Sequence, residues 1–380
     1  MTNNGNVLIS GASVAGPALA HWLLRYGFRP TVVERAPALR DGGYAVDFRG
    51  PAVDVLERMG VMAEVRRHST RMGDATLIGP DGLPYATLPS TVFSGELEIL
   101  KGDLTRVLYD LTRDRAEYVF GDSVTALSQD ADGVRADFER GEPRVFDLVV
   151  GADGLHSVVR SLAFGPEARY LRPLGLYGGV FTTANYLGLD HSGLLYSAPG
   201  KSVNVFSARS NTEARVSLSF AADGLAYDRH DTGAQKRIVA ERFADDGWEI
   251  PRLLRLMDEA SDFWFDTSAQ VRMDGWSDGR IVLLGDAAHC AAPTSGLGTS
   301  QALVGAYVLA GELASAHGGY REAFDAYERE MRAYVEGNQL IGEQVADHLF
   351  GVSGRTMPDV LAEPVPEETG DRIRLKTYPA

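Results

Sequence analysis

The chain has 380 residues, with 44% hydrophobic and 23% charged residues and a formal net charge of −15. This length is expected to form two domains, and the acidic balance argues against a nucleic-acid partner, which would need clustered Lys and Arg. No apolar run approaches the ~20 residues that span a bilayer, and the N-terminus is unlike a signal peptide, so we expect a cytoplasmic protein without a membrane partner. The single cysteine, Cys290, excludes an internal disulfide and a thiolate metal cage.

Residues 6–35 are expected to form a β-α-β unit, in which strand NVLIS, a helix over about 15–26 and strand TVVER follow one another. The first turn of this unit is GASVAG. Gly11 permits the tight turn, Ser13 is small enough for the backbone to approach a pyrophosphate, and Gly16 lets the helix pack closely on the strand. The free N–H groups at the start of the helix would face the phosphates.

An acidic residue, Glu34, ends the second strand, where it would accept hydrogen bonds from a ribose, and Arg35 beside it would contact the adenosine end. Strand, turn, helix, second strand and acid together predict a bound dinucleotide. The alternative is a tight strand-to-helix turn in an ordinary α/β protein, and Ser13 replaces the usual second glycine of the motif.

The next part of the chain alternates between helices and strands. Two amphipathic helices, PAVDVLERMGV and KGDLTRVLYDLTRD, are predicted on either side of strands over 75–88. From 171 to 270, alternating apolar and polar residues predict successive antiparallel strands, interrupted by one helix near 234–248. A buried-strand pattern, RIVLLG, then leads to a long helix from about Thr299. A nucleotide-binding domain with an inserted sheet is therefore expected.

A second glycine motif, GADGLHS, occupies 151–157 after an apolar strand and is followed by Arg160. Asp153 would organise the loops and the approach of a phosphate rather than donate a proton. The alternative is that Asp153 and Gly154 form a plain turn and that Ser157 caps the following helix.

A third motif, GDAAH at 285–289, is followed by PTSGLG at 293–298. Asp286, at the end of a strand, would accept a hydrogen bond from a sugar hydroxyl. The backbone N–H groups at the start of the long helix would stabilise negative charge, which a flavin develops at its N1/C2 edge on reduction. His289 is interpreted as a hydrogen-bonded structural histidine rather than a catalytic base.

In this order and at these separations, the three motifs resemble those of the group A FAD-dependent monooxygenases, the aromatic hydroxylases of the p-hydroxybenzoate hydroxylase type. The layout is most similar to the tetracycline-inactivating branch and to related actinobacterial natural-product monooxygenases. The resemblance implies an α/β fold with a Rossmann-like FAD-binding domain, an inserted, mainly antiparallel β-sheet domain for substrate, and C-terminal helices. The implied boundaries are 1–74, 89–170 and 271–350 for the first domain, 75–88 and 171–270 for the second, and 351–380 for a C-terminal tail.

The resemblance also implies which residues contact FAD, with the adenosine near Glu34 and the ribityl chain and pyrophosphate near Asp286. Lys101 matches a FAD-contacting arginine of the family, whose planar fork a lysine lacks. The expected FAD contacts are Gly11, Ser13, Ala15, Gly16, Glu34, Arg35, Asp47, Lys101, Asp153, Asp286, Pro293, Gly296, Leu297 and Gly298.

Arg40 and Asp153 are expected to contact NAD(P)H. The substrate cavity is expected to be walled by side chains on or near the inserted strands, although at least half of these must simply belong to the core. The candidates are Phe181, Tyr196, Phe206, Phe220 and Met273.

By the same resemblance, NAD(P)H would reduce FAD, O₂ would form a flavin C4a-hydroperoxide, and one oxygen atom would pass to an aromatic or polycyclic natural product, in antibiotic biosynthesis or resistance. No acid or base side chain is expected to be essential, because the chemistry belongs to the cofactor, and no metal is expected. Two alternatives remain: a flavin-dependent reductase or dehydrogenase that needs no O₂, and a non-catalytic FAD-binding protein.

Overall fold

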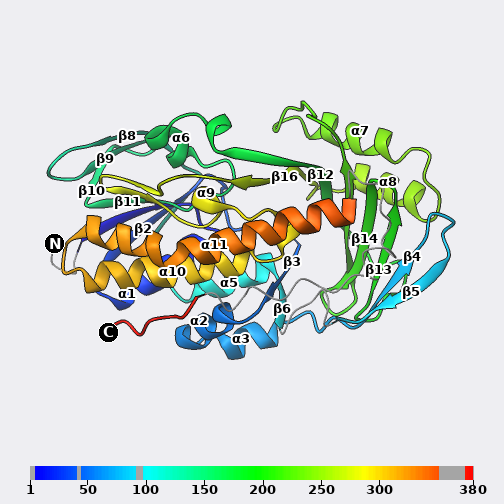
Figure 1. The fold of residues 1–380 in the computed structure, drawn as a ribbon, viewed down its shortest axis with the longest axis horizontal. Coiled ribbons are helices and arrows are strands. Elements are labelled where there is room, and N and C mark those ends of the chain that lie inside the picture. The colour runs from blue at the N-terminus through cyan, green and yellow to red at the C-terminus, as the bar shows by residue number, and fades with distance from the viewer. Residues whose placement is uncertain (1–4, 41–43, 91–96, 351–372, 380) are drawn as a thin grey trace.

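The computed structural model describes residues 5–40, 44–90, 97–350 and 373–379, without the side chains of 348–350. A six-stranded sheet lies toward one end of the molecule and a seven-stranded sheet toward the other (Figure 1). The long helix α11 extends from the first end toward the second. The mixed α/β fold predicted from the sequence is confirmed.

The six-stranded sheet has the order β17-β18-β11-β1-β2-β7, and every neighbouring pair is parallel except β17 with β18. Its central strands are buried almost throughout, as is typical of a parallel sheet with helices on both faces. Strand β18 pairs with β11 although five strands of the seven-stranded sheet, β12 to β16, intervene in sequence. The strands are β1 (Asn6–Ser10), β2 (Arg29–Glu34), β7 (Glu117–Phe120), β11 (Leu148–Gly151), β17 (Ser277–Asp278) and β18 (Ile281–Leu283).

Helix α10 (Gly298–Ser315) is the central helix beside this sheet. Its residues from Ser300 to Ala314 are all buried, because α1 and α11 both pack against it. Among the described residues, no helix is both long enough and apolar enough to cross a bilayer. The other helices of this part are α1 (Ala15–Arg25), α2 (Pro51–Met59), α3 (Met62–Arg67), α5 (Lys101–Asp110), α6 (Val158–Phe164), α9 (Asp286–His289) and α11 (Tyr320–Phe350), with 3₁₀ turns η1 (Glu167–Arg169) and η2 (Pro293–Ser295).

Two small antiparallel sheets complete this part of the molecule. One pairs β3 (Ala45–Phe48) with β6 (Leu97–Leu100). The other joins β8 (Val124–Gln129), β9 (Val134–Phe138) and β10 (Arg144–Phe146).

The seven-stranded sheet has the order β16-β12-β15-β14-β13-β4-β5 and is antiparallel except where β13 meets β4. Two helices accompany it, α7 (Thr232–Arg242) and α8 (Ile250–Glu259), where the sequence predicted only one. Pro251 lies in the first turn of α8, a position that tolerates proline. The strands are β4 (Ala75–Ile78), β5 (Pro84–Leu88), β12 (Leu171–Ala184), β13 (Gly193–Ala198), β14 (Lys201–Ala208), β15 (Glu213–Ala221) and β16 (Trp264–Val271).

The two faces of this sheet differ in what covers them. On the helix-covered face, apolar side chains such as Val205 and Val216 are fully buried in one cluster with Val239 of α7 and Leu253 of α8. On the opposite face, which we call the inner face, the alternate residues of the same strands are half-buried. The inner face comprises Gly178, Val180, Leu195, Ser197, Ser202, Asn204, Phe206, Ser217 and Ser219.

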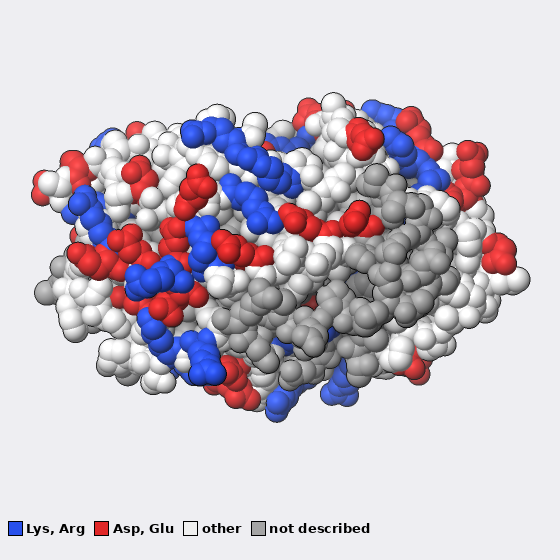
Figure 2. All heavy atoms as spheres, in the orientation of Figure 1, with Lys and Arg blue, Asp and Glu red and all other residues white. Residues whose placement is uncertain are grey.

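The described end of the chain, 373–379, packs along α10. The Glu312 carboxylate accepts hydrogen bonds from Lys376 Nζ and Tyr378 Oη, both at 2.8 Å. A Cβ on Gly311 would overlap the Tyr378 ring. The tail predicted for 351–380 lies otherwise outside the described residues. On the molecular face drawn in Figure 2, basic and acidic side chains are interspersed.

Candidate functional site

The GASVAG turn leaves no room for side chains at its glycines. A Cβ on Gly16 would lie 1.9 Å from the carbonyl oxygen of Gly11, and one on Gly11, whose φ is +109°, would lie 2.4 Å from that of Ala152. Ser13, between them, is exposed. The glycines therefore let the chain pack closely on itself, and Ser13 is the point where the turn before α1 is accessible to a pyrophosphate.

Glu34 holds this turn in place. Its two carboxylate oxygens accept hydrogen bonds from the backbone N–H groups of Ala12 and Ala36, each at 2.9 Å. Each carboxylate oxygen keeps a further lone pair, so a ribose hydroxyl can still donate to it. Arg35 and Arg40 are both exposed in the segment that follows.

Gly285 brings the starts of two helices together. Its φ is +64°, and a Cβ there would lie 3.3 Å from the Cβ of Ala15 and 3.5 Å from that of Ala302. Ala15 opens α1 and Ala302 lies near the start of α10, so both helices begin beside one turn. Their positive ends therefore converge on a single region. Gly285 belongs to the third motif but was not among the expected contacts.

Three polar residues expected at the FAD site meet at the turn before α10. An Asp286 oxygen lies 3.7 Å from the Cβ position of Gly298, and an Asp47 oxygen lies 3.9 Å from that of Gly296. The Lys101 ammonium lies 5.4 Å from the centre of the Tyr44 ring. Tyr44 raises the pKa of Lys101, and Asp286 adds to this effect, so the side chain stays cationic beside Asp286.

The same turn is accessible from solvent: Pro293 and Gly296 are exposed, and Leu297 and Gly298 are half-buried. The N–H groups of Gly296 and Leu297 donate to the Pro293 carbonyl oxygen and to Ser295 Oγ, both at 3.1 Å. A carboxylate, an ammonium group and the first backbone N–H groups of α10, from Gly298 on, are thus arranged around one small region. These groups suit the ribityl hydroxyls and the electron-rich edge of a flavin.

Glu98 was missed by sequence reasoning. It lies directly opposite Asp47 in the β3–β6 pair and accepts a hydrogen bond from Thr70 Oγ1. Burial raises the pKa of Glu98 to about 7, and the Asp47 carboxylate adds to the rise. Burial also raises the pKa of Asp47. No motif marks Glu98, because only the register of two short strands brings it here.

Asp153 organises the second glycine motif. Its carboxylate accepts hydrogen bonds from the N–H groups of Val158 and Val159, at 2.9 and 3.1 Å, and from the Ser10 hydroxyl at 3.3 Å. Ser157 Oγ caps α6 by accepting from the N–H of Arg160 at 2.9 Å. Asp153 thereby fixes the end of β1 against the start of α6, the loop-organising role expected for it.

Arg160 joins the second motif to the third. Its fully buried guanidinium donates to the carbonyl oxygen of Ala287 at 2.9 Å and to that of Leu155 at 2.6 Å. The turn that carries Asp286 is therefore held by a side chain from α6.

His156 ties the second motif to the seven-stranded sheet. Its Nδ1 lies 2.9 Å from Glu167, and its Nε2 lies 3.2 Å from Asp266 on β16. Burial lowers the pKa of His156, but the hydrogen bonds to Asp266 and Glu167 outweigh it, and the pKa rises to about 8.

His289 is enclosed by partners. Its Nδ1 accepts from the Gln301 amide at 2.8 Å, so its Nε2–H donates to Tyr327 Oη at 3.0 Å. Burial lowers the pKa of His289 to about 3. The ring is therefore neutral and structural, as the sequence indicated.

Four of the five expected substrate-wall residues lie in hydrophobic cores. Phe181, Tyr196 and Phe220 are on the helix-covered face, each at most 2% exposed, and Met273 belongs to the core of the six-stranded sheet. The expectation that these four line the cavity does not fit this packing, because their side chains are covered by α7 and α8 or by the other core. Phe206 alone lies on the inner face.

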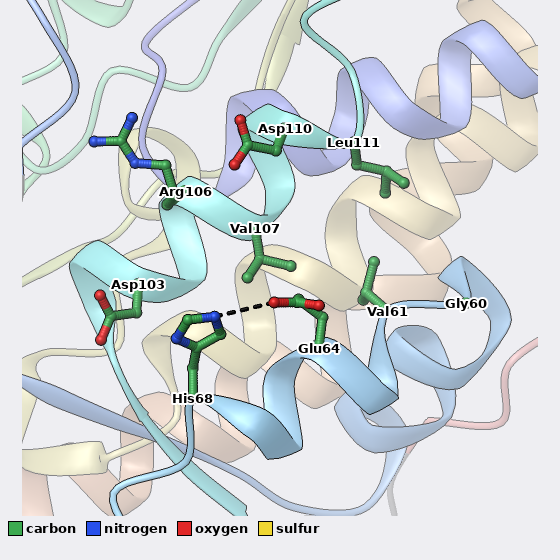
Figure 3. Close-up of a pocket in the computed structure, with 9 residues that line it drawn as sticks. All are labelled: Gly60, Val61, Glu64, His68, Asp103, Arg106, Val107, Asp110 and Leu111. Atoms are coloured by element: carbon green, nitrogen blue, oxygen red, sulfur yellow. Dashed lines mark hydrogen bonds and ion pairs between the residues drawn. The ribbon is translucent and has the colours of Figure 1, made fainter. Parts of the chain in front are cut away.

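A shallow pocket of about 370 Å³ lies between α3 and α5 (Figure 3). His68 points toward Glu64 within it, and carboxylates from Asp103 and Asp110 share its lining. No residue expected at the FAD site lines this pocket, so we assign it no ligand. Among the described residues, no group of His, Cys, Asp and Glu could hold a metal ion.

Comparison with known proteins gives consistent results. The model of the FAD binding domain family matches residues 4–339. The uncharacterized protein Rv1260 of Mycobacterium tuberculosis is 45% identical over 97% of both chains. A flavin-dependent monooxygenase of Legionella longbeachae is 37% identical, covering 98% of this chain and 95% of its own. The crystal structure of tetracycline destructase Tet(55) superposes with a TM-score of 0.86 at 38% identity, covering 95% and 94% of the two chains.

Proposed function

This chain belongs to the FAD binding domain family, as a flavin-dependent monooxygenase of group A, and from that premise we propose that it consumes NAD(P)H and O₂ to insert one oxygen atom into a polycyclic aromatic natural product. The observation that carries the proposal is the convergence of two helix starts, Asp286 and Lys101 on one open turn. Bound FAD would supply the redox chemistry, by accepting a hydride and activating O₂.

The chain's own residues would hold FAD at both ends. Ser13 and the N–H groups at the start of α1 would bind the pyrophosphate, and Glu34 the adenosine ribose, with Arg35 nearby. Asp286 would accept from the ribityl hydroxyls. Lys101 and the first N–H groups of α10, from Gly298 on, would stabilise negative charge at the flavin edge.

NAD(P)H would approach from solvent, where Arg40 is exposed. Asp153 would act on it indirectly, through the turn that its hydrogen bonds fix.

We place the substrate between the turn at 296–298 and the inner face of the seven-stranded sheet. Several contacts tie this sheet to the first domain, among them His156 with Asp266, and Arg209 with Asp103 on α5 at 3.1 Å. Such a junction is a common place for a ligand site. We accordingly propose that 75–88 and 171–270 form the substrate domain and that 1–74, 89–170 and 271–350 form the FAD-binding domain.

The experiment is an absorbance spectrum of the purified protein, followed by parallel recordings of NADPH oxidation and O₂ uptake with tetracycline and a panel of polycyclic phenols. The proposal expects a flavin spectrum and substrate-stimulated O₂ uptake, with catalase present to identify any uptake that ends as peroxide. NADPH oxidation without O₂ uptake would favour a reductase. A colourless protein that does not take up added FAD would contradict the proposed function altogether.

A further inference from the structure

The inner face carries small hydroxyl and amide side chains where four strands lie side by side. The register aligns Ser217 of β15 with Asn204 of β14, and Asn204 with Leu195 of β13. The next row aligns Ser219 with Ser202. All five side chains are half-buried, and none belongs to either hydrophobic cluster of the described residues.

The helix-covered face of the same strands is buried and apolar throughout this stretch. Val203, Val205, Val216 and Leu218 alternate with these residues on the same two strands, and each is 0% exposed. A wholly apolar face and a hydroxyl-bearing face thus share one pair of strands. Packing against α7 and α8 explains the apolar face, whereas nothing in the core requires Asn204.

Asn204 and Ser217 form a connected pair. The Asn204 side-chain amide donates to Ser217 Oγ at 3.2 Å. The second amide N–H, the amide oxygen and the Ser217 hydroxyl proton then remain able to bond to a ligand. The pair can therefore both donate to and accept from an oxygen substituent.

Positive charge on this part of the inner face is already neutralised. Arg215 lies beside this part of the inner face, opposite Phe206 in the β14–β15 register, and it is buried. Its guanidinium lies 3.2 Å from Glu213 and 3.5 Å from Asp262, and it also donates to Thr182 Oγ1. A substrate carboxylate on this face would lose its hydration without gaining an ion pair.

Resting on the function proposed above, we propose that Asn204 and Ser217 determine specificity for a neutral fused-ring substrate bearing keto or hydroxyl oxygens. Leu195 and Phe206 beside them supply apolar contact for the rings. A site that hydrogen-bonds a substrate oxygen discriminates strongly against analogues that lack it, because its own polar groups are then left unpaired.

Three fused-ring probes test this selectivity: 1,8-dihydroxyanthraquinone, its 3-carboxylate, and anthracene, which carries no oxygen. Binding to the FAD-loaded enzyme is measured by equilibrium dialysis without NADPH, using the probes' own absorbance. We expect the neutral dihydroxy probe to bind at least about tenfold more tightly than the other two.

The variants separate specificity from folding. Asn204→Leu, which keeps the number of side-chain heavy atoms, should weaken binding of the dihydroxy probe about tenfold and leave binding of anthracene unchanged. Ser217→Ala should have the same effect, but a smaller one. The matched control is Val205→Ala, one residue along β14 on the helix-covered face. It should lower thermal stability but leave the ratio of the two affinities as in the wild type.

Three results would overturn the inference: a carboxylate probe that binds as tightly as the neutral one, an unchanged ratio in Asn204→Leu, or no binding of any probe. Because the probes report their own binding, dialysis also works on protein without FAD. Failure of the proposed function is therefore seen separately, as a colourless protein that does not take up FAD.

Discussion

The glycine-bordered turns and the seven-stranded sheet differ in what makes each of them functional. In the turns the backbone itself forms the site, and in the turn before α1 contacts of 1.9 and 2.4 Å at the Cβ positions of Gly16 and Gly11 leave glycine as the only choice. In the sheet the same strands carry two faces, and the helices α7 and α8 decide which one is core. A backbone site can thus be read from a motif, whereas a side-chain site depends on which face is covered.

The largest effect is expected at the turn before α1. Gly16→Ala would force the Gly11 carbonyl out of position, because the new Cβ would lie 1.9 Å from its oxygen. We expect loss of FAD binding and a destabilisation of about 3 kcal/mol or more, measured by flavin absorbance and urea unfolding. The control is Gly275→Ala, whose Cβ would meet nothing within 4 Å. A yellow, stable Gly16→Ala protein would show that the turn does not need the glycine.

The second test compares the two faces of the sheet. Phe220 packs against Tyr177, Phe243 and Phe265 on the helix-covered face, so Phe220→Ala should cost about 3–5 kcal/mol of unfolding free energy. Phe206→Ala, on the half-buried inner face, should cost about 1 kcal/mol but weaken substrate-probe binding. Urea unfolding and the dialysis assay measure both quantities. The reverse pattern, with Phe206 important for folding and Phe220 for binding, would exchange the roles of the faces.

The third test concerns the junction of the two regions at His156. The pKa of His156 in the folded protein, about 8, lies above its ordinary value of 6.5. Its stabilising contribution is therefore complete below about pH 6.5 and is lost as the pH rises through 8; it amounts to about 2 kcal/mol. Between pH 6 and pH 9, the wild type should lose about that much more unfolding free energy than His156→Gln. Parallel stability profiles would argue against the charged bridge to Glu167 and Asp266.

The smallest effect is expected at Lys101, where a side chain adds to a backbone site. Lys101→Met removes the cation beside Asp286 and should lower the affinity for FAD about tenfold, which corresponds to about 1.4 kcal/mol of binding free energy. Lys101→Arg keeps the charge and should bind FAD within a few-fold of the wild type. Fluorescence titration of the apoprotein with FAD gives both values, and equal affinities for the Met and Arg variants would remove Lys101 from the site.

The sequence predicted the local backbone features of the molecule but not which face of the seven-stranded sheet is covered. The β-α-β unit and the long helix from about Thr299 were predictable because glycine patterns and helical periodicity are local, and α10 begins at Gly298. The substrate wall was not, because Phe181 and Phe220 have the same period-2 pattern as a cavity-facing residue. Only the packing of α7 and α8 distinguishes them, and α8 was not foreseen. Glu98 lies beyond sequence reasoning for a related reason, since strand register alone brings it to Asp47.

The most direct test of this account is a crystal structure of the protein with FAD and 1,8-dihydroxyanthraquinone bound. We expect the pyrophosphate at the backbone between Gly11 and Gly16, the flavin edge at 296–298, and the anthraquinone oxygens within hydrogen-bond distance of Asn204 or Ser217. FAD bound away from these turns, or a probe lodged on the helix-covered side of the sheet, would contradict it.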